Sequence, residues 1–188
     1  MRSILITGVS GVGKTTVSRR TAETLGLKNW DYADLMLRVA PEFDHQDQLQ
    51  TLSPGRRDRI YREVETLLAE LFEPGDRGPE CVLLENHLSI VEEGRIRTFP
   101  HSDCRRYNAV ALVVVEADPA RIMQWRQADP HRARNLGSVE QVLLQQACNR
   151  QEADLIAAYL KIPMTVIAND RVDRSSEHLT AWLREVVP

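Results

Sequence analysis

A glycine-rich segment near the start of the chain has the residue types and the spacing that hold phosphate groups. It runs Gly8-Val9-Ser10-Gly11-Val12-Gly13-Lys14-Thr15-Thr16 and satisfies the pattern Gly-x-x-x-x-Gly-Lys-Ser/Thr. Glycines allow a turn that points backbone N–H groups at phosphate oxygens, and the start of a helix adds positive dipole. Lys14 would then reach the β- and γ-phosphates of a nucleotide, and the Thr15 hydroxyl would bind the Mg²⁺ that bridges them.

The competing interpretation of this segment is a strand-to-helix turn with an accidental lysine. An apolar run, Ile4-Leu5-Ile6, precedes the segment and a helical pattern follows it, which is the context that the phosphate-binding motif requires. Asn-Lys-x-Asp and Asp-x-x-Gly, which a GTPase switch needs, occur nowhere in the chain. A large motor ATPase would need further domains. The sequence therefore favours phosphoryl transfer from a nucleotide to a small acceptor.

Short apolar runs predict the strands that position this loop, and their continuous hydrophobicity is typical of a parallel sheet. They are Ile4-Leu5-Ile6, Val82-Leu83-Leu84, Val110 to Val115 and Thr165-Val166-Ile167, with a weaker run at Lys28 to Tyr32. Helical patterns alternate with the strands. Their predicted apolar faces are Ile60, Val64, Leu67, Leu68 and Leu71; Val139, Val142 and Leu143; and Leu179, Trp182, Leu183 and Val186. This alternation predicts an α/β sandwich.

The composition is that of an ordinary globular protein. The chain has 188 residues, 43% hydrophobic and 27% charged, with a net charge of -3, and this length favours one domain over residues 1–188. The near-neutral charge argues against binding to nucleic acid. No run approaches the roughly 18 apolar residues that span a membrane. Cys81, Cys104 and Cys148 are scattered and are expected to be reduced thiols, so we expect a cytoplasmic protein.

A polar segment, residues 128–138, lies between two helical patterns and contains Arg132 and Arg134. It is either a mobile lid that brings arginines to a phosphate or an ordinary helix–helix loop. The phosphate-binding loop favours the lid, because guanidinium groups stabilise the charge of a transferring phosphate. Arg126 precedes the segment and would either reach the same phosphates or stabilise the C-terminal end of its helix.

Six stretches of the sequence resemble archaeal-type adenylate kinases in order and spacing, over nearly the full length. They are the glycine-rich loop, Asp31 to Leu37, Glu85-Asn86-His87, Glu116 to Pro119, Asp129 to Asn135 and Val166 to Asn169. The resemblance implies a P-loop NTPase three-layer sandwich, with a five-stranded parallel sheet, helices on both faces and a short lid. It also implies ATP and Mg²⁺, a nucleoside monophosphate, AMP, as acceptor, and a homo-oligomer, commonly a trimer.

The resemblance also gives roles to residues of the donor site. Arg132 and Arg134 match the family's lid arginines. Glu85 stands at a strand end where the family usually has aspartate, and it would bind Mg²⁺ together with Thr15. Asn169, beyond the last strand, would approach the base of ATP through its own backbone, or it is a residue of a turn.

The acceptor site is expected to involve residues 31–62 and 86–106. His87 keeps a family position and would line the site, although a lone histidine at a strand end is more often structural. Asp34 would lie along the monophosphate, and its alternative role is a helix cap. Asp118 is interpreted as an N-cap alone.

This acceptor half departs from the family, because Gln50 and Thr51 stand where basic residues are expected. Arg95 and Arg97 alternate like strand or hairpin positions, so both would face one side and contact the acceptor instead. The sequence thus predicts an ATP-dependent nucleoside monophosphate kinase that acts on AMP. The alternatives are a kinase of the same fold with another acceptor, motivated by Gln50 and Thr51, and an ATP-binding sensor without turnover.

Overall fold

The computed structural model describes residues 1–50, 52–72, 81–92, 94–98, 104, 107–129 and 137–187. Arg132, Arg134 and Thr51 lie outside the described residues, as does the proline- and glycine-bearing segment 74–80 that precedes a strand. Among the described residues, no helix is long and apolar enough to cross a membrane.

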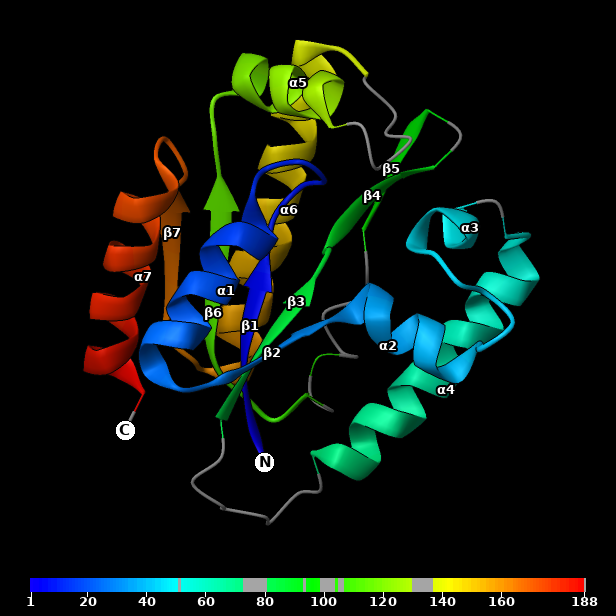
Figure 1. The fold of residues 1–188 in the computed structure, drawn as a ribbon, viewed down its shortest axis with the longest axis horizontal. Coiled ribbons are helices and arrows are strands. Elements are labelled where there is room, and N and C mark those ends of the chain that lie inside the picture. Colours follow the sequence, from blue (N-terminus) through cyan, green and yellow to red (C-terminus); the bar gives the residue numbers. More distant parts are fainter. Residues whose placement is uncertain are drawn as a thin grey trace.

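A parallel five-stranded sheet forms the centre of the molecule (Figure 1). Its strand order is β2 (Lys28–Asp31), β3 (Cys81–Asn86), β1 (Arg2–Thr7), β6 (Ala109–Glu116) and β7 (Met164–Ala168). All five strands predicted from apolar runs are confirmed, with one boundary moved, since Tyr32 begins a helix instead of ending β2. β1 lies between β3 and β6, so the loop after β1 leaves from the middle of the sheet.

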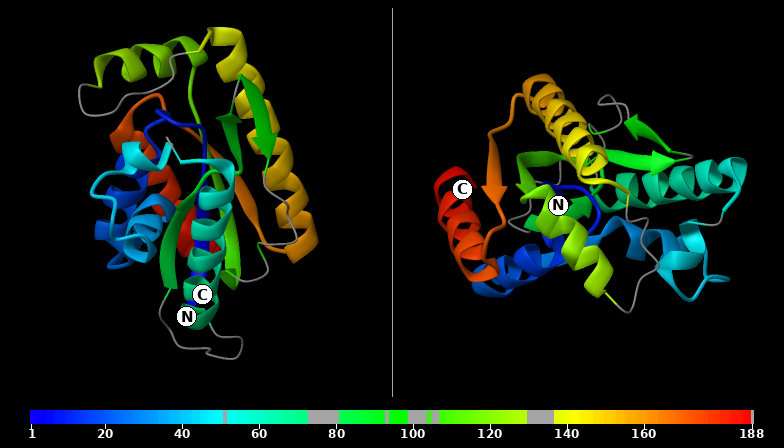
Figure 2. Two further views of the ribbon diagram at one scale, coloured as in Figure 1. Left: turned by 90° about the vertical axis from the view of Figure 1, so that its right-hand side faces the viewer. Right: turned by 90° about the horizontal axis from the view of Figure 1, so that it is seen from above.

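Helices cover both faces of this sheet, as Figure 2 shows. α1 (Lys14–Leu25) and α7 (Val172–Val186) pack together on one face, where they meet Ile4 and Ile6. α4 (Pro54–Leu71) and α6 (Val139–Leu160) lie on the other face with Leu5. Alternating residues of β1 thus enter two separate cores, and the predicted three-layer sandwich is confirmed.

Three further helices lie near the C-terminal edge of the sheet (Figure 1). α2 (Tyr32–Val39) follows β2 directly and packs on α4, and α3 (Gln46–Gln50) continues from it. α5 (Pro119–Ala128) follows β6 and is capped by Asp118, whose side chain accepts a hydrogen bond from Arg121 N as the sequence predicts. The helices α5 and α6 flank the segment that contains Arg132 and Arg134.

The apolar face predicted for α6 is wrong. Val142 is buried, but Val139 and Leu143 are 42% and 58% exposed. The inner face of α6 instead carries polar side chains, Gln145, Gln146 and Asn149, at most 7% exposed. Each amide has a hydrogen-bond partner, which is Ser89 for Gln145, Ala117 for Gln146 and Thr7 for Asn149, and these bonds offset the cost of burying it.

A β-hairpin outside the main sheet carries two of the predicted acceptor residues. β4 (Ser89–Glu92) and β5 (Arg95–Thr98) pair antiparallel, and Gly94 between them has φ 75°. The alternation expected at Arg95 and Arg97 is therefore that of a strand. Gln145 of α6 donates to Ser89 O at 3.2 Å and joins the hairpin to the helix layer.

Candidate active site

The glycine-rich loop connects the central strand β1 to α1. Its glycines stand where the backbone has a positive φ or approaches another strand closely. Gly11 and Gly13 have φ of 81° and 83°, in the left-handed region that L-residues rarely adopt. A Cβ on Gly8 would lie 2.6 Å from Val115 O, so the loop packs directly on the β6 backbone. The strand-loop-helix context that the sequence predicts for this motif is confirmed.

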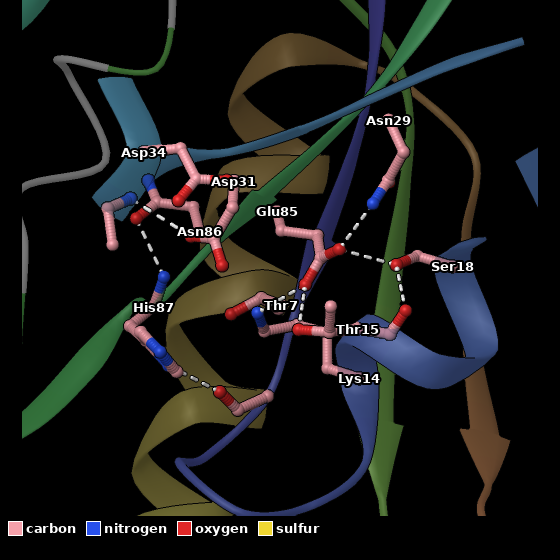
Figure 3. Close-up of polar contacts among 12 residues, drawn as sticks. Thr7, Lys14, Thr15, Ser18, Asn29, Asp31, Asp34, Glu85, Asn86 and His87 are labelled. Atoms are coloured by element: carbon pink, nitrogen blue, oxygen red, sulfur yellow. Dashed lines mark hydrogen bonds and ion pairs between the residues drawn. The ribbon is translucent and has the colours of Figure 1, made fainter. Parts of the chain in front are cut away.

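Glu85, at the end of β3, is the centre of a buried polar cluster (Figure 3). Its Oε2 accepts hydrogen bonds from Lys14 Nζ at 3.0 Å and Thr15 Oγ1 at 2.7 Å. Its Oε1 accepts from Ser18 Oγ at 2.5 Å and Asn29 Nδ2 at 2.6 Å. The carboxylate is 0% exposed and Lys14 is 6% exposed, so this is a buried ion pair whose oxygens are fully hydrogen-bonded.

The cluster keeps the carboxylate ionised. Burial opposes ionisation and would raise the pKa of Glu85. The Lys14 ammonium and the hydrogen bonds from three neutral donors outweigh burial and lower the pKa of Glu85 from 4.5 to about 2. A charged oxygen ligand is therefore present next to the Thr15 hydroxyl, and both are the hard oxygen donors that Mg²⁺ prefers.

These residues fit a Mg²⁺ ion that keeps most of its ligands as phosphate oxygens and water. In the described part of the chain, no group of three or more His, Cys, Asp or Glu side chains gathers as a metal site. Mg²⁺ in phosphoryl-transfer sites is held by only one or two protein oxygens, with substrate phosphates supplying others. Thr15 and Glu85 provide such a set.

A pocket of about 300 Å³ opens beside this cluster, between α1, β2 and α2. Its lining includes the carboxylates of Glu23, Asp31 and Asp34 and the guanidinium of Arg19. Burial raises the pKa of Asp31, although the Lys14 charge and the hydrogen bond from Ala33 N oppose the shift. The structure brings Asp34 to this pocket, where it is exposed and accepts a hydrogen bond from Gln46 Nε2.

The helix cap expected at Asp34 falls three residues earlier. Asp31 is the N-cap of α2, and its Oδ1 accepts a hydrogen bond from Ala33 N at 2.9 Å. Asp34 lies in the first turn of the helix instead. The difference follows from the early end of β2, since the cap is the residue that leaves the strand.

Three residues expected to contact substrate hold the backbone of the phosphate-binding loop. Arg126 is 7% exposed and donates to Ser10 O through Nε at 2.9 Å and a terminal nitrogen at 2.7 Å. His87 Nδ1 lies 2.7 Å from Gly8 O, and Asn169 Nδ2 donates to Val12 O at 2.8 Å.

These contacts show what the side chains of Asn169 and Arg126 bind in the structure. Asn169 is 1% exposed and lies against Gly13, where a Cβ would meet its Nδ2 at 2.3 Å. Its side chain therefore supports the loop backbone at Val12 and Gly13. The guanidinium of Arg126 is directed to the loop backbone, which neither of its two predicted roles anticipated.

Arg95 and Arg97 are exposed on β5. One terminal nitrogen of Arg97 lies 3.8 Å from Asp58 Oδ1 on α4, a weak surface ion pair. On α4 itself, Arg59 is 73% exposed and pairs with Glu63, as expected for a solvated helix face. The hairpin, the loop and α5 lie at the same end of the molecule (Figure 1).

Sequence reasoning missed Ser18 and Asn29, both of which bind Glu85 directly. Ser18 lies one helical turn after Lys14, so the two side chains share a face of α1, and this spacing could have identified it. Asn29 gives no such signal, because its approach to Glu85 depends on the pairing of β2 with β3.

The sheet order, the glycine-rich loop and the cluster at Glu85 define a P-loop kinase domain. Residues 7–142 match a family model described as an AAA domain. A shikimate kinase from Bacteroides thetaiotaomicron superposes with a TM-score of 0.63 at 16% identity, covering 97% of this chain and 98% of that one. A gluconokinase from Sinorhizobium meliloti gives 0.54 at 15% identity, covering 98% and 94%. These structures show likeness of fold alone.

Curated relatives give the family. The adenylate kinase of Thermoplasma acidophilum is 33% identical over 174 residues, which are 90% of each chain. The adenylate kinase of Thermococcus onnurineus is 26% identical over 190 residues, 98% of this chain and 94% of the relative. The chain belongs to the archaeal-type adenylate kinase family and is a phosphotransferase, as the resemblance predicts.

Proposed function

We propose that the chain transfers the terminal phosphoryl group of ATP to AMP and forms two molecules of ADP. The observation that carries this proposal is the convergence of Lys14, Thr15 and Glu85 at the loop that leaves the central strand. The family supports AMP as acceptor, since the curated relatives are named adenylate kinases.

The donor site binds the phosphates of ATP through the loop N–H groups and Lys14. Thr15 and Glu85 hold Mg²⁺, which, when bound, neutralises charge on the β- and γ-phosphates. Arg126, His87 and Asn169 keep the loop carbonyls turned away from the phosphates. No protein nucleophile is needed for in-line transfer between two bound nucleotides.

Arg132 and Arg134 belong to this proposal as the residues that close over the transferring phosphate. Such arginines stabilise the charge on the phosphoryl oxygens more strongly in the transition state than in bound ATP. We therefore expect Arg134→Ala to lower kcat by about 10²-fold or more and to change the dissociation constant of ATP little. Single-turnover rates and ATP titrations check this, and an unchanged kcat would remove the lid assignment.

The acceptor is held from the hairpin side in this proposal. Arg95 and Arg97 would bind the phosphate of AMP, because planar guanidinium groups pair with phosphate oxygens from several directions. Asp34 would lie along the acceptor, with residues 31–62 and 86–106 as the surrounding region.

The whole chain would act as one domain, and exposed apolar residues of α6, including Leu144 and Leu155, support a homo-oligomer.

A second candidate acceptor is a small alcohol. The observation in its favour is the acidic pocket beside Thr15, where Asp31 has a raised pKa and Asp34 is a neighbouring carboxylate. Carboxylates repel a phosphate dianion but accept hydrogen bonds from hydroxyl groups. A carboxylate with a raised pKa is also the better base toward a hydroxyl proton.

One assay distinguishes these functions. The chain is incubated with MgATP and separate acceptors, which are nucleoside monophosphates, phosphate-free polyols and water alone, and ADP is measured. AMP-dependent ADP formation well above the water rate is expected. Turnover with a polyol alone would establish the second candidate. ATP binding without turnover on any acceptor would indicate a nucleotide sensor and overturn the proposal.

A further inference from the structure

The four donors to Glu85 divide into two pairs by the oxygen that they reach. Lys14 and Thr15 donate to Oε2, at 3.0 and 2.7 Å. Ser18 and Asn29 donate to Oε1, at 2.5 and 2.6 Å. In Figure 3, Lys14, Thr15 and Ser18 reach the carboxylate from α1, and Asn29 reaches it from β2.

Nucleotide binding would involve only the first pair of donors, Lys14 and Thr15. Both belong to the phosphate-binding motif, so in the complex the Lys14 ammonium would bind the phosphates and the Thr15 hydroxyl would bind Mg²⁺. Ser18 and Asn29 lie outside the motif. Their bonds to Oε1 can therefore persist while both donors of Oε2 are withdrawn.

We propose that Ser18 and Asn29 are positioning residues that hold Glu85 by Oε1 and so present Oε2 to Mg²⁺ in the ATP complex. This inference rests on the donor half of the proposed function. A glutamate side chain has three rotatable bonds, so its carboxylate can take several orientations. Two short hydrogen bonds to one oxygen compensate for that freedom, since outer-shell partners fix the orientation of metal-binding carboxylates.

Both donors lie on regular elements of secondary structure. Ser18 is 0% exposed on α1, and its hydroxyl also lies 3.2 Å from Thr15 O, longer than its bond to Glu85. Asn29 lies on β2, which pairs with β3 through Asn29 and Leu83, two residues before Glu85.

The orientation of the Asn29 amide is fixed by the carboxylate, which can only accept hydrogen bonds. Asn29 Nδ2 therefore faces Glu85, and Asn29 Oδ1 is buried without a hydrogen-bond partner in the described part of the chain. An unsatisfied amide oxygen is costly. Of the two polar groups of the Asn29 amide, only Nδ2 has a hydrogen-bond partner among the described residues, and that partner is Glu85.

The test measures metal binding separately from catalysis. Mn²⁺, a paramagnetic substitute for Mg²⁺, is titrated into the enzyme–ATP complex and followed by electron paramagnetic resonance. ATP binding without metal is measured by calorimetry in EDTA. For Ser18→Ala and Asn29→Ala we expect the Mn²⁺ dissociation constant to rise about tenfold or more, while metal-free ATP binding changes less than about twofold.

Ser176→Ala is the matched control. Ser176 is also a buried helical serine, but its hydroxyl bonds backbone carbonyls at Val172 and Val17. It should leave Mn²⁺ binding unchanged. Unchanged Mn²⁺ binding in both Ser18→Ala and Asn29→Ala would overturn the inference, as would an equal loss of Mn²⁺ affinity in the control.

A double-mutant cycle tests the route through Glu85. In a Glu85→Gln background the carboxylate is gone, so Ser18→Ala should weaken Mn²⁺ binding by less than about twofold further. A full additional tenfold loss would show that Ser18 acts elsewhere and would overturn the inference. None of these titrations needs an acceptor, so they remain decisive if AMP proves to be the wrong substrate.

Discussion

Lys14 and Glu85 form an ion pair inside the protein, where charges are costly to bury. Lys14 is 6% exposed and Glu85 is 0% exposed. Apolar residues of similar size would stabilise such a site at least as well. The pair is therefore better explained by the chemistry of phosphate and metal binding than by folding.

Lys14 is the one charged residue in the glycine-rich segment Gly8–Thr16. Lys14→Ala should abolish ADP formation, because no other residue of the loop supplies a charge to the phosphates. It should also destabilise the fold by about 3 kcal/mol or more, since Glu85 is left buried without its cation. Urea unfolding measures the second effect. Lys14→Met with Glu85→Gln removes both charges, and its stability should exceed that of Lys14→Ala.

A second prediction separates the possible roles of Arg126. If the guanidinium shapes the loop by holding Ser10 O, Arg126→Ala should raise the dissociation constant of ATP about tenfold or more, given two charge-assisted hydrogen bonds. Arg121→Ala on the same helix is the control, because Arg121 is exposed and lies over the Trp125 ring. A large loss of kcat with unchanged ATP binding would instead place Arg126 on the transferring phosphate.

At the scale of elements, the hairpin β4–β5 determines how Arg95 and Arg97, the arginines proposed for the acceptor site, are presented. Arg97→Ala should raise the KM for AMP about tenfold, the effect of one lost charge-assisted contact with phosphate. Asp58→Asn removes the ion pair but keeps the guanidinium, so it should leave this KM close to that of the wild type. If both variants raise KM equally, the ion pair with α4 matters more than contact with AMP. Steady-state kinetics with varied AMP check this.

The elements differ in how well the sequence predicts them. Strands such as β1 and β6 are buried on both faces, so a continuous apolar run identifies them. The apolar pattern does not identify the buried face of α6. Gln145 and Asn149 occupy that face, and their hydrogen-bond partners are distant in sequence. The loop motif is local, so the sequence predicts it residue by residue. Contacts such as Asn29 with Glu85 depend on strand order, which no local pattern contains.

For the whole molecule, the buried cluster makes stability depend on acid. The pKa of Glu85 is about 2 in the folded chain and near 4.5 when unfolded. Between these pH values the unfolded chain binds more protons than the folded chain. The contribution of Glu85 to stability is therefore complete above about pH 4.5 and is lost as the pH falls toward 2. Glu85→Gln should flatten this part of the profile. Urea unfolding at several pH values checks it, and an unchanged slope would contradict the shift.

The place of β1 in the middle of the sheet has a consequence for ligand linkage. The binding loop begins from a strand paired on both sides, with β3 and β6, so local opening at a sheet edge leaves the loop intact. Unfolding of the central sheet removes the loop with it. Bound nucleotide is therefore thermodynamically linked to global unfolding, and a destabilising change in any strand reduces the fraction of molecules able to bind ATP.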